Sequence, residues 1–140
     1  MNWLYWSLLS AFFAGLTAVL AKVGVAGVDS NLATAIRTSV ILVFAWTMAW
    51  VTAKPAELAA ISGRTWLFLA LSGMATGLSW LCYFRALQLG QASQVAPIDK
   101  LSVVFVLLFA AMFLREPLTL RSALGGLLIV AGAIVLAWKR

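Results

Sequence analysis

Apolar residues occupy five long runs of the chain, separated by short polar segments. The runs cover about residues 3–21, 32–53, 65–87, 93–114 and 122–138. A helical residue rises about 1.5 Å, so the first run covers roughly 28 Å, about one hydrocarbon core of a bilayer. Strands of outer-membrane barrels are only about ten residues long and alternate in polarity. The pattern therefore predicts an all-α polytopic membrane helix bundle with about five transmembrane helices.

Polar residues and prolines mark the ends of these runs. Ser30 or Asn31 is expected to cap the second run. The fourth run stops at "REP", where Pro117 disfavours helix in the residue before it. Tryptophans near the run ends fit the aromatic belt of a membrane interface. The loops are too short for a soluble domain, so residues 1–140 are expected to form a single transmembrane domain.

Composition supports a membrane solvent. Apolar residues make up 64% of the chain and charged residues 10%, against about 25% charged in a typical soluble domain. The net charge of +6 comes from singly scattered basic residues, which fits helix-end charges better than nucleic-acid binding. With one cysteine and no histidine, we expect no catalytic residue, no metal site, no cofactor and no enzyme activity.

Five charged residues lie within the runs or directly at a run end: Lys22, Arg37, Arg85, Asp99 and Lys100. If the amino-terminal side is called side A, five spans place all of these charges toward the opposite side, side B. Charges within a membrane are expensive and mark functional sites. Helix neighbours point about 100° apart, so we expect the partner of Asp99 on another helix, at Lys22, Arg37 or Arg85.

The depth of Asp99 depends on where the fourth helix begins. If it begins at Pro97, the proline occupies a favoured first-turn position and Asp99 is interfacial, while Lys100 extends to the headgroups. If it begins near Ser93, Pro97 removes a backbone hydrogen bond and Asp99 lies about two turns deep. The sequence leaves both alternatives open.

The predicted substrate pathway joins the intruding charges to aromatic and polar residues deeper in the runs. Its members are Lys22, Arg37, Trp46, Trp80, Tyr83, Arg85, Pro97, Asp99, Lys100 and Ser102. The cationic excess predicts a small substrate that is anionic or zwitterionic. Four glycines are assigned to helix packing because small faces let helices approach in lipid: Gly73, Gly77, Gly125 and Gly132.

Basic residues give only a weak bias to orientation. Side A carries Lys54, Arg64, Arg115 and Arg121, and side B carries six Lys/Arg, three of them within the runs. Since Lys and Arg near span ends set orientation, this near-balance permits insertion in both directions.

Two segments carry a family resemblance. "YFRALQLGQASQVAPIDKLSVVF" followed by "FLREPLT" resembles the EamA-type branch of the drug/metabolite transporter superfamily, and "NLATAIRTSVILVFA" resembles that family's second span. The matching positions are Tyr83, Ala86, Leu87, Ala96, Pro97, Ile98, Phe113, Leu114, Glu116 and Leu118. The chain departs from the family at "DKLS". At this place the common family pattern is more apolar and contains a second proline.

The resemblance implies a multi-pass secondary carrier of the cell (inner) membrane, often an exporter, for small metabolites or drug-like molecules. Larger members have ten spans in two inverted five-span halves, and this chain resembles one half. An antiparallel homodimer in the bilayer would restore that symmetry, and a parallel dimer remains open. The alternatives are a flippase for an anionic lipid headgroup and a non-transporting membrane subunit of a larger complex.

Overall fold

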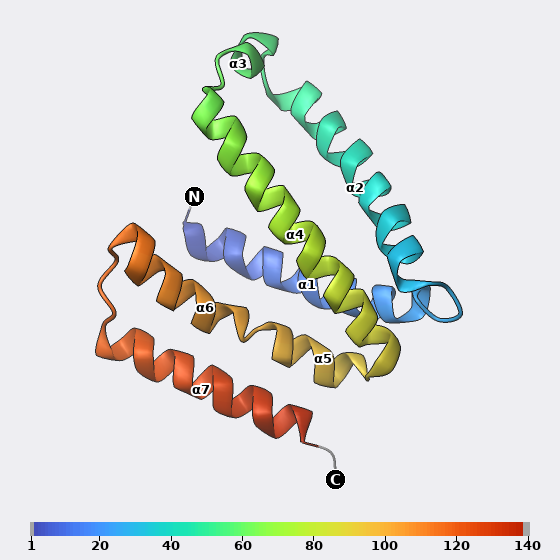
Figure 1. Cartoon of the computed structure of the whole chain (residues 1–140), viewed down its shortest axis with the longest axis vertical. Coiled ribbons are helices and arrows are strands. Elements are labelled where there is room, and N and C mark those ends of the chain that lie inside the picture. The colour runs from blue at the N-terminus through green and yellow to red at the C-terminus, as the bar shows by residue number, and fades with distance from the viewer. Residues whose placement is uncertain (1, 139–140) are drawn as a thin grey trace. The chain divides into compact units, whose positions relative to one another are not determined.

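The computed structural model describes residues 2–138, and these residues form helices and no strand (Figure 1). The elements are α1 (Trp3–Gly24), α2 (Ser30–Thr52), α3 (Pro55–Ala59), α4 (Gly63–Leu89), α5 (Ala92–Asp99), α6 (Ser102–Phe109), the π-helix η1 (Ala110–Leu114) and α7 (Leu120–Ala137). The fourth apolar run consists of α5, α6 and η1 together. The predicted all-α fold is thereby confirmed.

Five helical segments are long and apolar enough to cross a membrane. They are Trp3–Gly24, Ser30–Thr52, Gly63–Leu89, Ala92–Leu114 and Leu120–Ala137. Their ends differ from the predicted run ends by at most three residues. The 27 residues of α4 would cover about 40 Å at the usual helical rise, so this helix is long enough to extend into the headgroup layer or to tilt.

The chain divides into two compact units. The first unit comprises Met1–Val23 and Leu89–Arg140, and the second unit comprises Gly24–Gln88. The first therefore contains nearly all of α1 together with α5, α6, η1 and α7, and the second contains α2, α3 and nearly all of α4. The two units are described separately below.

The start of α2 is capped by Asp29, so the predicted caps Ser30 and Asn31 were wrong. The Asp29 carboxylate accepts hydrogen bonds from the backbone N–H groups of Asn31 and Leu32 at 2.9 and 3.0 Å. Ser30 is instead the first helical residue and is buried. The preceding turn needs Gly27, whose φ of +75° suits glycine best.

In the first unit, α7 packs against both α5 and α6, which lie beside it in Figure 1. The close approach of α6 and α7 occurs at Gly126, which is buried. A Cβ atom at this position would lie 3.3 Å from Leu107 Cδ1. The absence of a side chain at Gly126 thus allows α6 to approach α7, as small residues do in membrane helix pairs.

The four glycines predicted to pack helices have no such neighbour. A Cβ atom at Gly73, Gly77, Gly125 or Gly132 would meet no atom within 4 Å. These positions therefore do not hold helices together within their own units, and Gly126 has that role in the first unit. Packing of the four glycines against another surface stays a prediction.

Gly126 and Gly125 form a matched pair for testing this contact. Gly126→Leu should destabilise the purified protein by about 1–3 kcal/mol, because the new side chain collides with Leu107. Gly125→Leu should have little effect, since its Cβ enters open space. Thermal unfolding in mild detergent measures both. Equal melting temperatures for the two variants would contradict the α6–α7 contact.

Candidate functional site

Arg37 lies on aromatic rings inside the second unit. It is the eighth residue of α2, roughly 10 Å along the helix from its start. Its guanidinium carbon lies 4.2 Å from the ring centroid of Trp80 and 5.5 Å from that of Phe84. Trp80 and Phe84 are four residues apart on α4, so both rings present to the same side. The ring electrons attract the cation at these distances.

The contacts of Arg37 leave its charge without an anionic partner. Within the described residues, Arg37 forms no ion pair. Tyr83 lies within electrostatic reach of it, but a neutral phenol does not balance a full charge. A guanidinium carries five N–H donors in its plane, and an intramembrane cation normally pairs. The N–H edge of Arg37 is therefore suited to an incoming carboxylate or phosphate.

Arg85, also in the second unit, has a different role. Its Nη1 donates to Gln88 Oε1 at 3.0 Å, and Gln88 Nε2 donates to the Val28 carbonyl oxygen at 2.6 Å. These bonds tie the end of α4 to the loop before α2. Arg85 itself is exposed, which fits an interfacial charge better than an interior one.

In the first unit, the helix of the fourth span begins close to Ser93 and not at Pro97. The helix begins at Ala92, with Pro97 inside α5. Pro97 lacks an N–H, so the carbonyl of Ser93 loses its usual helical partner. Asp99 is the eighth residue of the span and lies about two turns from its start. The alternative with a helix start at Pro97 is thereby wrong.

The fourth span is broken immediately after Asp99. The backbone N–H groups of residues 100, 101, 103 and 104 each donate to the carbonyl three residues earlier, at 2.9–3.1 Å. These tighter bonds link α5 to α6, which begins at the exposed Ser102. A 3₁₀ segment inside a helix often marks a hinge, and discontinuous helices form the substrate sites of many carriers.

Asp99 pairs with its own neighbour, contrary to expectation. Lys100 Nζ lies 3.4 Å from Asp99 Oδ2, and the two side chains are 58% and 37% exposed, respectively. The expectation failed because α5 ends at Asp99, so Lys100 is on the turn and its long side chain can reach back. Lys22 instead donates to the Gly90 carbonyl oxygen at 2.7 Å.

The five intruding charges are divided between the units. Arg37 and Arg85 belong to the second unit, and Lys22, Asp99 and Lys100 belong to the first. Their place in one common substrate pathway therefore stays a prediction. Within the second unit, Arg37 does contact Trp80.

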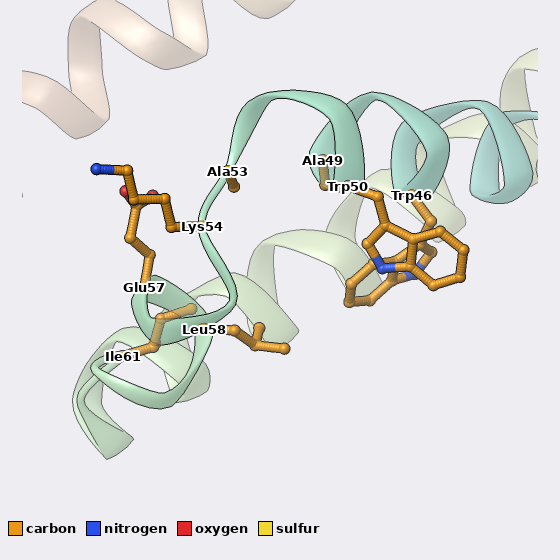
Figure 2. Close-up of a pocket in the computed structure, with 8 residues that line it drawn as sticks. All are labelled: Trp46, Ala49, Trp50, Ala53, Lys54, Glu57, Leu58 and Ile61. Atoms are coloured by element: carbon orange, nitrogen blue, oxygen red, sulfur yellow. The ribbon is translucent and has the colours of Figure 1, made fainter.

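Trp46 belongs to a separate groove on the second unit, shown in Figure 2. It lies nine residues after Arg37 on α2, roughly 13 Å further along the helix. The groove has a volume of about 580 Å³, and we call it the tryptophan groove. Its lining residues are Trp46, Ala49, Trp50, Ala53, Lys54, Glu57, Leu58 and Ile61. A role for Trp46 in the substrate pathway stays a prediction.

Sequence reasoning missed Phe84, Gln88 and the tryptophan groove. Phe84 follows Trp80 by four residues and Gln88 follows Arg85 by three, so helical spacing could have linked both pairs. The groove had no comparable signal because α3 is a short helix within a loop.

Five apolar spans, an arginine held on aromatic rings within a span and a broken fourth helix are the features of a multi-pass α-helical membrane protein. The EamA-like transporter family matches residues 1–138. The chain belongs to this family, which confirms the resemblance carried by the third and fourth spans. It is accordingly a membrane transporter of the drug/metabolite type.

Several curated proteins are similar to the chain. A protein from Sinorhizobium sp. named "Uncharacterized transporter in cobO 3'region" is 58% identical over 97% of this chain and 96% of its own length. Two proteins named probable 4-amino-4-deoxy-L-arabinose-phosphoundecaprenol flippase subunit ArnE are more distant. The Enterobacter sp. protein is 37% identical over 52% of this chain and 68% of its own length. The Erwinia tasmaniensis protein is 40% identical over 53% and 70%, respectively.

No solved structure matches the chain.

Proposed function

We propose that this EamA-like chain is a secondary carrier that exports small molecules with an anionic group, and that Arg37 binds this group. The observation that carries the proposal is the Arg37 guanidinium, 4.2 Å from the Trp80 ring centroid and without an ion-pair partner in the described residues. A planar guanidinium binds carboxylate or phosphate through two parallel hydrogen bonds. The aromatic rings hold it in place without neutralising it.

The break in the fourth span supplies a means of movement for this carrier. The Asp99–Lys100 pair stands at the junction of α5 and α6, where 3₁₀-type bonds replace helical ones. Opening the pair would free one anion and one cation for the two charges of a zwitterion. Such an exchange of partners would couple substrate binding to a change at the hinge.

The proposed assembly is an antiparallel homodimer. A relative of nearly the same length is itself named a transporter, which supports a five-span chain as one subunit of the carrier. Carriers commonly consist of two inverted halves around a site near the middle of the bilayer. The near-balance of basic residues on the two sides would allow the inverted copies to form from one sequence.

Flux into proteoliposomes tests the substrate class. The purified protein is reconstituted, and counterflow is measured with radiolabelled small carboxylates, zwitterionic amino acids and quaternary ammonium cations. We expect exchange of members of the first two groups and none of the cations. Exchange restricted to the cations would contradict an anion-binding Arg37.

A second candidate function is that of a subunit of a lipid-linked sugar flippase. It is favoured by the two ArnE proteins, whose names describe flippase subunits. Under this alternative, the same arginine would bind the phosphate of the lipid carrier. Movement of a labelled polyprenyl phosphate across the proteoliposome membrane, without exchange of soluble anions, would favour this function.

A further inference from the structure

The tryptophan groove is apolar along most of its length and charged at one end. Trp46 and Trp50 lie one turn apart on α2 and form one wall, while Leu58 stands opposite on α3 (Figure 2). Among the described residues that line it, Lys54 and Glu57 carry charge. Lys54 immediately precedes α3 and Glu57 lies in its first turn. A cation and an anion thus flank one end of an apolar groove.

The apolar surface continues beyond the two tryptophans. A second hollow of about 470 Å³ is lined by Leu42, Val43, Trp46, Thr47 and Trp50. The two hollows share Trp46 and Trp50, so both lie against the same two side chains of α2. The lining of the second hollow extends the apolar surface toward the middle of the second span. An elongated apolar molecule with a polar head would match this surface.

The charged end lies at the boundary between membrane and water. The second span ends at Thr52 and the third begins at Gly63, so Lys54 and Glu57 stand in the connecting loop. Tryptophan is enriched at this boundary because its ring is amphipathic. Trp50 is 81% exposed, which leaves its ring available to lipid. The volume of each hollow is typical of small-molecule sites.

We propose that the tryptophan groove binds a zwitterionic phospholipid with a primary ammonium headgroup. Lys54 receives the lipid phosphate, Glu57 accepts hydrogen bonds from the ammonium group, and Trp46 and Trp50 contact an acyl chain. An anionic lipid satisfies Lys54 but is repelled by Glu57. A quaternary headgroup has no N–H to donate to the carboxylate. The site is separate from Arg37, so its failure would leave the proposed transport function untouched.

Native mass spectrometry of the purified full-length protein tests this site. Phosphatidylethanolamine, phosphatidylcholine and phosphatidylglycerol are titrated separately, and bound lipid is counted. We expect the wild-type protein to bind phosphatidylethanolamine most tightly. Glu57→Gln should weaken that binding by about 1.5-fold to fivefold, the range set by one exposed charge pair, without weakening the binding of phosphatidylglycerol. Lys54→Gln should weaken the binding of both lipids.

Two variants separate the groove from the general membrane surface. Trp50→Ala should weaken the binding of all three lipids, because it removes apolar contact without changing the charges. Arg64→Gln should leave the binding of each lipid unchanged, because Arg64 lies outside the groove. Its guanidinium carbon is 5.8 Å from the Phe68 ring centroid. Circular dichroism confirms that each variant keeps its helices. Equal binding of the three lipids to the wild type, or wild-type affinity of Glu57→Gln for phosphatidylethanolamine, would overturn the proposal. Tightest binding of phosphatidylglycerol would also overturn it.

Discussion

Arg37→Ala should lower substrate flux about tenfold to hundredfold in proteoliposomes at limiting substrate. A hydrogen bond to a charged group contributes about 1.5–3 kcal/mol, and each 1.4 kcal/mol is a factor of ten in affinity. Arg37→Lys should retain part of the activity, because it keeps the charge but loses the planar pair of donors. Initial rates over a range of substrate concentrations show whether the loss is in apparent affinity, as a binding role requires.

Arg64 provides the matched control for this experiment. It is also an arginine above an aromatic ring, with its guanidinium carbon 5.8 Å from the centroid of Phe68, but it stands at the start of α4, near the water. Arg64→Ala should leave flux within about twofold of the wild type, as expected for an exposed charge. Equal losses in the Arg37 and Arg64 variants would mean that net charge matters and that the aromatic site has no special role.

The spans were predictable because their signal is local. A run of about twenty apolar residues is enough to identify a membrane helix, and Pro117 marked the end of the fourth span at Leu114 correctly. The start of that span was harder to predict. Proline is favoured in the first helical turn and is also tolerated inside membrane helices, so Pro97 fitted both alternatives.

The contacts between helices were less predictable, because they depend on how each helix is rotated. Gly125 and Gly126 are adjacent in the sequence, yet only Gly126 meets another helix, since neighbours point about 100° apart. Arg37 was identified as a charge within an apolar run, but its contact with Phe84 requires the relative position of α2 and α4. The partner of Lys22 is a backbone carbonyl, which leaves no trace in the side-chain pattern.

The second prediction with a large expected effect concerns the orientation of the chain in the membrane. If the active unit is an antiparallel homodimer, the chain should insert in both directions in comparable fractions. The single exposed Cys82 is first replaced by serine. A cysteine is then introduced at Ala60, which is exposed in the loop after α3. This position is preferable to Ser62, whose hydroxyl accepts a hydrogen bond from the Thr65 backbone at 3.2 Å.

In intact cells, an impermeant thiol reagent should label Ala60→Cys in about half of the molecules. Permeabilisation should make the remaining molecules accessible to the reagent. Ala26→Cys, exposed in the first loop on the other side, should behave in the same way. Two lysines added after Met1 should bias all copies to one orientation and abolish transport, because no inverted partner would remain. Coexpression with a copy neutralised at Lys54, Arg64 and Arg121 should restore transport. Labelling of Ala60→Cys from one side only, in an active protein, would exclude the antiparallel dimer and favour a parallel one or a different partner subunit.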